Sequence, residues 1–190
     1  MNIQGWDERY RSRERRAEDL DAAATPLVIE ASNKLRPGGA LDLACGAGRN
    51  ALYLAEEGWH VTAVDGSAEA IAVLRGRADD RALKVDARTA DLTRNEFAIE
   101  PDSWDLITIC YYLQRDLFEP AKRGVVPGGT LQAIAHTIEG NEEPNASRLA
   151  LGEMATYFQG WEITHQYEGK PADPAHRRSV AEIVARKPTS

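Results

Sequence analysis

The chain has 190 residues, a formal net charge of −7 from 30 acidic and 23 basic side chains, and a hydrophobic fraction of 43%. This size and composition predict a single globular domain over residues 1–190 with a sizeable core. The negative balance disfavours proteins that bind nucleic acid or an anionic membrane surface, and no apolar run reaches the ~20 residues of a membrane span.

The two cysteines, Cys45 and Cys110, are too few for a disulfide framework, which predicts free thiols in a reducing cytoplasm. The polar start of the chain lacks the apolar core of a secretory signal. The four histidines show no spacing typical of metal ligands, so we expect no metal site. No pattern in the sequence points to an oligomeric state.

Residues 1–24 form a polar arm that we expect to be a solvated helix or a partly ordered segment. Within this arm, Trp6 and Tyr10 stand one helical turn apart. The sequence fits two roles for them equally well. They can dock the arm on the core, or they can close over a site as a lid.

Apolar spacing and stop signals define the remaining elements in chain order. Helices are predicted over 26–35, 51–58, 67–78, 113–124 and 146–158. Strands are predicted over 40–44, 59–65, 82–89, 103–112, 128–136, 161–169 and 177–187. We expect Ser67 to cap the third of these helices, and Pro120 to break or kink the fourth.

The order of these elements predicts the fold class. Strands that alternate with helices form βαβ units, which place the strands parallel with helices on both faces. The last two strands have no helix between them, so they should pair antiparallel. The predicted fold is therefore α/β: a doubly wound, mostly parallel sheet with one antiparallel strand near the C-terminal hairpin. Ligands bind such sheets at the carboxyl ends of the strands.

The turn after the first predicted strand, CGAGRN at 45–50, is rich in glycine. Gly46 and Gly48 permit positive φ and a close approach of the backbone to a ligand, beside the free N–H groups of a helix start. With Ala51 they also fit the fingerprint G-x-G-x-x-G/A, and Asp65 lies where that fingerprint has its ribose-binding acid. An NAD(P)-dependent oxidoreductase is therefore one hypothesis.

Charge favours a different ligand. Asp42, inside the first strand, would repel the pyrophosphate of a dinucleotide by about a kcal/mol or more. S-adenosylmethionine (SAM) carries a sulfonium and an ammonium and no phosphate, so an acidic lining suits it. Asp65 would accept both ribose hydroxyls, and Asp91 with Leu92 would meet the adenine. Each carboxylate also has a structural interpretation: Asp42 caps backbone N–H groups, Asp65 caps the next helix, and Asp91 is a turn residue.

Residues 40–67, ALDLACGAGRNALYLAEEGWHVTAVDGS, resemble motifs I and II of class I SAM-dependent methyltransferases. TADL at 89–92 is similar to their adenine-contact segment, and WDLITICYYL at 104–113 is similar to their fourth-strand motif. VPGGTLQAIAH at 126–136 resembles the "PGG" hairpin before their fifth strand. WDERY and GRN are most similar to the tellurite-resistance and thiopurine-type branch.

This resemblance implies a seven-stranded sheet whose last strand is inserted antiparallel, with SAM as the cofactor. Arg49 would help the glycine turn to hold the methionine moiety, and Cys110 would lie beneath the ligand. The cofactor-binding residues implied in this way are Asp42, Gly46, Gly48, Arg49, Asp65, Gly66, Asp91, Leu92 and Cys110.

Methyl transfer from a sulfonium is an in-line displacement in which alignment does much of the work. The fourth strand lacks the Asn/Asp-Pro-Pro-Tyr/Phe run of amino-group methyltransferases, so we expect a small-molecule acceptor: a thiol, chalcogen oxyanion, hydroxyl or carboxylate. Candidate catalytic groups are His136, Tyr112 and Arg115. A strand-end histidine bonded to backbone is the better interpretation of His136, whereas Arg115 either pairs with Asp116 or Glu119 or steers an anionic substrate. A SAM-binding regulator without turnover is a further alternative.

Overall fold

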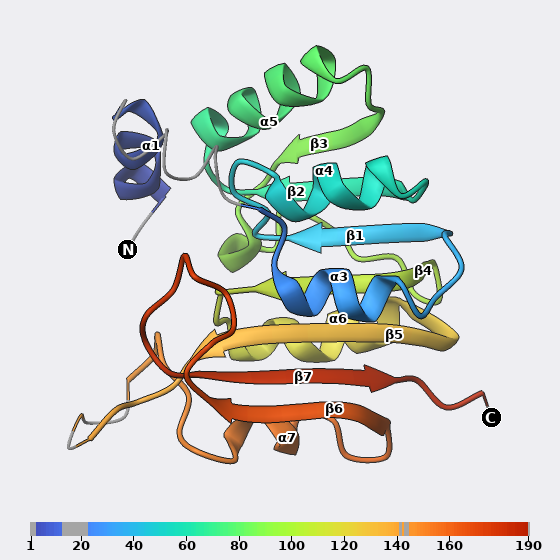
Figure 1. Cartoon of the computed structure of the whole chain (residues 1–190), viewed down its shortest axis with the longest axis vertical. Coiled ribbons are helices and arrows are strands. Elements are labelled where there is room, and N and C mark those ends of the chain that lie inside the picture. The colour runs from blue at the N-terminus through green and yellow to red at the C-terminus, as the bar shows by residue number, and fades with distance from the viewer. Residues whose placement is uncertain (1–2, 13–22, 141, 143–144, 190) are drawn as a thin grey trace. The chain divides into compact units, whose positions relative to one another are not determined.

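The computed structural model describes residues 3–12, 23–140, 142 and 145–189 (Figure 1). The chain forms two compact units, residues 1–98 and 99–190, and each is described by itself below. The interpretation of the chain as one domain stays a prediction. None of the helices in the described ranges is both long and apolar enough to cross a bilayer.

Unit 1 is a three-stranded parallel sheet with helices packed on it. Its helices are α1 (Ile3–Arg11), α3 (Pro26–Ser32), α4 (Arg49–Glu56), α5 (Ala68–Asp80) and the 3₁₀ turn η1 (Leu92–Arg94). Its strands are β1 (Gly39–Leu43), β2 (His60–Asp65) and β3 (Val85–Thr89). β2 pairs in parallel with β1 on one side and with β3 on the other, so the carboxyl ends of all three strands meet at one edge.

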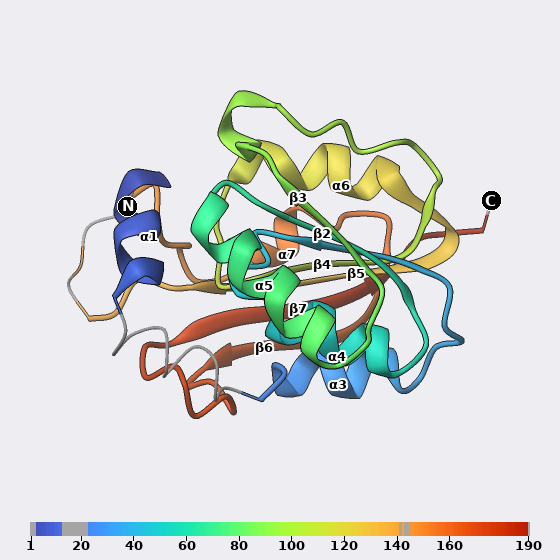
Figure 2. The ribbon, with the colours of Figure 1, turned by 90° about the horizontal axis from the view of Figure 1, so that it is seen from above.

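The buried residues explain this arrangement. Residues 40–43 of β1 are all buried, which is typical of a strand covered on both faces. On α4, the buried positions include Ala51, Leu52 and Leu54, and this helix packs against β2 while α5 packs against β3. In Figure 2, α4 and α5 lie on the same side of these strands. Because apolar residues fill the space between the strands and these helices, polar side chains that could bind a ligand are expected in the turns at the carboxyl ends of the strands.

The N-terminus of α5 is capped as the sequence predicts. Ser67 is the N-cap residue, and its side-chain oxygen accepts a hydrogen bond from the Ala70 N–H at 3.1 Å. Ser67→Ala should therefore lower the free energy of unfolding by about 1–2 kcal/mol, because it leaves this buried donor unpaired. Urea unfolding measures the loss. The control is Ser103→Ala, since the exposed Ser103 hydroxyl donates to the carbonyl of Pro101, two residues away, and caps no helix. Equal stability of the two variants would contradict the capping role.

Unit 2 holds the antiparallel part of the fold. Its strands are β4 (Trp104–Cys110), β5 (Val125–His136), β6 (Glu162–Gly169) and β7 (Val180–Arg186). Its helical elements are η2 (Arg115–Leu117), α6 (Phe118–Gly124) and α7 (Glu153–Thr156). β4 and β5 are parallel, and β7 pairs antiparallel with both β5 and β6. The predicted C-terminal hairpin is therefore confirmed, with β7 inserted between β5 and β6.

One predicted helix is mostly wrong. The expected helix over 146–158 is reduced to α7, because the preceding residues pair with the end of β5 instead. The Leu149 N–H donates to the His136 carbonyl at 2.9 Å, and the Ile138 N–H donates to the Leu149 carbonyl at 2.9 Å. Gly152 then takes a φ of +79° at the start of α7. These tertiary hydrogen bonds outweigh the helical spacing of the sequence.

Two other helical predictions are refined by the structure. Pro120 does not break α6, because it lies in the first turn, where a backbone N–H has no intrahelical partner to lose. In the N-terminal arm, residues 3–11 form α1, which includes Trp6 and Tyr10. The part of the arm over 13–22 lies outside the described residues.

Candidate functional site

The glycine turn of unit 1 follows β1 directly. Gly46 and Gly48 have φ values of +55° and +80°, the left-handed region that glycine enters without strain. The Cys45 N–H donates to the Val64 carbonyl at 3.0 Å, and the Gly48 N–H donates to the Cys45 carbonyl at 3.0 Å. These bonds hold the turn against the end of β2, and α4 begins at Arg49.

Asp65 joins the end of β2 to this turn. Its Oδ2 accepts the Gly46 N–H at 2.8 Å, and its Oδ1 accepts the Ser67 N–H at 2.8 Å. Burial raises the pKa of Asp65, and these two N–H bonds oppose the shift. A carboxylate has about four acceptor sites, so this one has capacity for further donors. The cap of α5 is Ser67, so Asp65 orders the turn before the helix.

Asp42 is a buried carboxylate beside the same turn. Its side chain is 1% exposed, and its Oδ2 has no hydrogen-bond partner among the described residues. Burial raises the pKa of Asp42 to about 7, with a further increase from the charge of Asp65; the charge of Arg49 and a backbone hydrogen bond with Ala51 act in the opposite direction. An unpartnered buried oxygen is costly, and a cation or hydrogen-bond donor would relieve that cost.

The other predicted cofactor residues of unit 1 differ in their surroundings. Arg49 lies within electrostatic reach of Asp42, and its Nη1 donates to the Ala23 carbonyl at 3.3 Å. Asp91 caps η1, because its Oδ1 accepts from the Thr93 N–H at 2.9 Å and from the Thr93 hydroxyl at 2.7 Å. The structure thus brings Asp42, Asp65, Gly46, Gly48 and Arg49 together, whereas the Asp91 carboxylate serves its own turn.

The adenine segment still reaches the end of β2 through its backbone. The Ala90 N–H donates to the Asp65 carbonyl at 2.9 Å, and the next two residues are Asp91 and the buried Leu92. Gly66 lies between Asp65 and the Ser67 cap. Within the described ranges, no three His, Cys, Asp or Glu side chains are grouped so as to hold a metal ion.

Asp7 is a fourth carboxylate at this edge that the sequence did not single out. Its Oδ1 accepts from the Ser67 hydroxyl at 2.5 Å, and its charge raises the pKa of Asp65. A separation of 60 residues from Ser67 hides this contact from any local pattern. Only the WDERY segment that contains Asp7 carried a signal.

Unit 2 has a polar aromatic cluster at the carboxyl ends of β4 and β5. Tyr111 follows β4 with a φ of +58°, a strained value for a residue with a bulky side chain. Its ring stacks on His176 with centroids 3.4 Å apart, and its hydroxyl donates to the buried Asp173 carboxylate at 3.0 Å. The His136 ring lies 5.6 Å from the Tyr111 ring and 5.4 Å from the His176 ring.

His136 has the features of a neutral imidazole. Burial lowers its pKa, and the charges of Arg178 and Arg148 lower it further, against an interaction with the Ser179 backbone. Its Nδ1 is buried and has no hydrogen-bond partner in the part of the chain that the structure describes. The backbone-bonded interpretation therefore accounts for only part of this side chain, since one ring nitrogen is left over.

The other two candidate catalytic residues are engaged elsewhere. The Tyr112 hydroxyl donates to the Gln114 side chain at 2.7 Å. Arg115 donates to both carboxylate oxygens of Glu153, at 2.7 and 3.1 Å, and this bond raises the pKa of Arg115. The expected pairing of Arg115 with Asp116 or Glu119 is wrong, because α7 presents Glu153 to the guanidinium in a bidentate geometry.

Arg115 also donates to the carbonyls of Ala146 and Arg148, so it fastens the segment before α7. Cys110 ends β4 with its Sγ 3.2 Å from the Thr108 hydroxyl, and its predicted place beneath a ligand stays a prediction.

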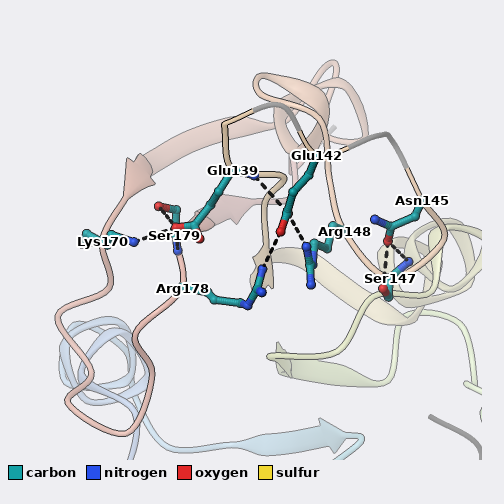
Figure 3. Close-up of polar contacts among 8 residues, drawn as sticks. All are labelled: Glu139, Glu142, Asn145, Ser147, Arg148, Lys170, Arg178 and Ser179. Carbon is teal, nitrogen blue, oxygen red and sulfur yellow. Dashed lines mark hydrogen bonds and ion pairs between the residues drawn. The ribbon is translucent and has the colours of Figure 1, made fainter.

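An ionic network fixes the loop that follows His136 and the loop that contains His176 (Figure 3). Glu139 accepts from Lys170 at 2.6 Å and from the Ser179 hydroxyl at 2.7 Å, while Glu142 binds Arg178 at 3.0 Å and also pairs with Arg148. The hydrogen bond from Lys170 lowers the pKa of Glu139 to about 2, and that from Arg148 does the same for Glu142. These pairs join the loop after β5 to the loop between β6 and β7.

Sequence reasoning missed Asp173 and His176, and with them the contacts that they make with Tyr111. His176 and Asp173 belong to the segment KPADPAH, which reads only as a hairpin loop. The register of β5 with β7 brings this loop to the end of β5, since His136 pairs with Val180. Only a prediction of that register would have found the cluster.

Comparison with known proteins agrees with the geometry. The family model described as "Tellurite resistance protein TehB" matches residues 18–172. The "Probable S-adenosyl-L-methionine-dependent methyltransferase TehB" of Haemophilus influenzae is 25% identical over 148 residues, which are 74% of this chain and 52% of that protein. The chain therefore spans about half the length of this curated relative.

Solved structures confirm the fold class. The crystal structure of TehB from Haemophilus influenzae has a TM-score of 0.72 and 25% identity, over 84% of this chain and 61% of that one. A SAM-dependent methyltransferase from Methanosarcina mazei has a TM-score of 0.70 and 17% identity, over 88% and 100%. The predicted doubly wound, mostly parallel seven-stranded sheet with one antiparallel strand is confirmed. Because the family model covers well over half of its residues, the chain belongs to the TehB family.

Proposed function

We propose that this chain is a SAM-dependent methyltransferase that moves a methyl group to a small-molecule acceptor by in-line displacement. The observation that carries the proposal is the buried, unpartnered Asp42 oxygen next to the glycine turn, with Asp65 held against Gly46. These carboxylates suit the sulfonium and ammonium of SAM. Membership of the TehB family and the name of the Haemophilus influenzae relative support the same cofactor.

The site argues against a nicotinamide dinucleotide. A pyrophosphate at the glycine turn would meet Asp42, Asp65 and Asp7 together, and their repulsion adds up at short range. Arg49 is a cation within electrostatic reach of Asp42, and the attraction between the two charges offsets part of the charge of Arg49. If this chain were an oxidoreductase, the negative charges of its own carboxylates would oppose the binding of the cofactor's pyrophosphate.

Unit 2 carries the candidate acid–base groups. Neutral His136 is a base that can take a proton from a thiol or hydroxyl acceptor, and the Tyr111 hydroxyl beside it is oriented by its hydrogen bond to Asp173. Among the four expected acceptor classes, the family description favours a chalcogen oxyanion, which needs no base when it is already ionised. The two free cysteines support action in a reducing cytoplasm.

Calorimetry with SAM and with NADH tests the cofactor, and labelled SAM with thiols, chalcogen oxyanions, phenols and carboxylates tests the acceptor. We expect heat with SAM, none with NADH, and label transfer to one acceptor class. Heat with NADH alone would make the chain an oxidoreductase. Heat with SAM and no transfer to any acceptor would make it a SAM-binding regulator.

SAM affinity should depend on pH through Asp42. The pKa of Asp42 in the folded protein, about 7, is above the ordinary aspartate value of 3.8, so the side chain is largely protonated at pH 6 and ionised at pH 8. A cation favours the ionised form, so affinity should fall by up to about tenfold per pH unit below 7. Titrations at pH 6, 7 and 8 measure it, with proton release detected in buffers of different ionisation enthalpy.

Two controls separate Asp42 from other titrating groups. Asp42→Asn should flatten the profile, and the neutral thioether product S-adenosylhomocysteine should show a weaker dependence than SAM. The α-amino group of SAM titrates in the opposite sense, with a pKa of about 8, so it cannot mimic the loss below pH 7. A wild-type profile that is flat between pH 6 and 8 would contradict the role of Asp42.

A further inference from the structure

Helix α1 lies on the predicted cofactor turn. Figure 1 shows α1 on the side to which the arrowheads of β1 and β2 point, and Figures 1 and 2 both show it beside the first turn of α5. The helix packs against α5, and both belong to unit 1. The family model that matches the chain begins at residue 18, so α1 lies outside the residues that it covers.

Two α1 side chains fill the space directly over two predicted cofactor-binding glycines. The Tyr10 hydroxyl lies 2.5 Å from the point that a Cβ on Gly46 would occupy. The Ile3 Cδ1 lies 2.8 Å from the corresponding point on Gly66. A Cβ at either glycine would overlap α1, and so would a ligand atom placed at the same point beside that glycine.

The attachment of α1 is local and small. The Tyr10 ring packs against Ala47, Ala70 and Val73. Asp7 accepts from the Ser67 hydroxyl, and Arg11 pairs with Glu69 at 3.0 Å in an exposed ion pair. A helix of nine residues is too short to be stable without such contacts. Because few contacts hold α1 on the rest of unit 1, we expect the helix to detach at a low cost in free energy.

We propose that α1 is a gate on the cofactor site, displaced from Gly46 and Gly66 when SAM binds. The inference rests on the proposed function, because it takes SAM to approach these glycines. In their docked positions Tyr10 and Ile3 fill the space beside Gly46 and Gly66, so a cofactor atom cannot enter that space until α1 moves. Of the two roles that the sequence left equal for Trp6 and Tyr10, the geometry points to the lid.

Trp6 supplies a reporter on the moving helix. It is 38% exposed, its ring centroid lies 6.4 Å from that of Tyr10, and Arg9 stacks over it. We expect SAM to change the acrylamide quenching of the wild-type protein, and Trp6→Phe to abolish that change while calorimetry still shows SAM binding. In the matched control, Trp161→Phe, the change should remain.

The rate of SAM association gives a second readout. Ile3→Ala and Arg11→Gln each loosen α1 without changing a residue of the glycine turn, and both should raise the association rate constant by about 3–10-fold, because the open form becomes more populated. Stopped-flow fluorescence measures the rate. The control is Glu30→Gln, which removes a similar exposed ion pair between Glu30 of α3 and Lys34 and should leave the rate unchanged.

The outcomes separate this inference from the proposed function. If the wild-type protein binds SAM but quenching and the rates of Ile3→Ala and Arg11→Gln stay unchanged, α1 is a fixed packing arm and the inference is wrong. If the wild-type protein gives no heat with SAM, the proposed cofactor is wrong, and the gate for it is wrong too.

Discussion

Gly48→Ala is expected to lower the free energy of unfolding by about 2–5 kcal/mol. The first part, about 1–2 kcal/mol, comes from placing an L-residue at a φ of +80°. The second, about 1–3 kcal/mol, comes from overpacking, because the new Cβ would lie 2.1 Å from the Leu74 Cδ1. Leu74 is fully buried on α5, so it cannot turn away into solvent.

Two other glycines provide matched controls for these two effects. Gly76 lies inside α5 with nothing near its missing Cβ, so Gly76→Ala should stabilise the protein by up to about 1 kcal/mol. Gly58 has a φ of +86° and also open space, so Gly58→Ala should show the backbone strain alone. Thermal unfolding distinguishes the three variants, at about 2–4 °C per kcal/mol for a chain of this length.

A double variant tests the contact with Leu74 directly. If the clash is real, Gly48→Ala and Leu74→Ala together should cost less than the sum of the two single changes, since the smaller side chain makes room for the new Cβ. Additive losses would mean that Gly48 is required for its backbone angle only. A double-variant loss smaller than the sum would mean that the second fingerprint glycine is needed by the packing against Leu74 of α5, whether or not a ligand contacts it.

The first half of the fold was predictable because its signals are local. Ser67, the alternation of short apolar runs with helices, and the Pro37-Gly38-Gly39 stop each act within a few residues of where they stand. The helix over 146–158 failed because the competing hydrogen bonds come from β5. Helical spacing of apolar residues predicts a helix only weakly where the end of a neighbouring strand offers backbone groups for hydrogen bonding.

The residues of the candidate site also fall into those that local sequence signals bring together and those that meet only through contacts distant in sequence. Asp42, Asp65 and the glycine turn follow from strand ends in one βαβ unit, so their meeting could be predicted. Asp7 reaches Ser67 from the N-terminal arm, and no periodicity reports that contact. The cluster of Tyr111, Asp173 and His176 depends on the register of an antiparallel strand far along the chain, which composition and spacing leave open.

If Asp65 binds the ribose hydroxyls as proposed, Asp65→Ala should weaken SAM binding by about 1–3 kcal/mol, or roughly 5–150-fold in the dissociation constant, because those hydrogen bonds are lost. The same change leaves the Gly46 and Ser67 N–H groups without their 2.8 Å acceptors, so it should also destabilise the fold. Calorimetry well below the unfolding temperature separates the loss of SAM affinity from the loss of stability. At that temperature the variant is folded, so the measured affinity reflects the lost ligand bonds and the altered turn and not unfolding.

The comparison with two other variants assigns the loss. Asp86→Ala removes an exposed carboxylate of β3 that pairs with Arg88, and it should leave SAM affinity unchanged. Asp65→Asn keeps an acceptor oxygen for one of the two backbone N–H groups, so it should recover part of the stability but little of the affinity if the ligand needs the carboxylate. Wild-type affinity in Asp65→Ala would mean that Asp65 only orders the turn. Of the carboxylates of Asp42 and Asp65, that of Asp42 alone would then attract SAM. The dependence of SAM affinity on pH would be the experiment that still tests the charge of Asp42.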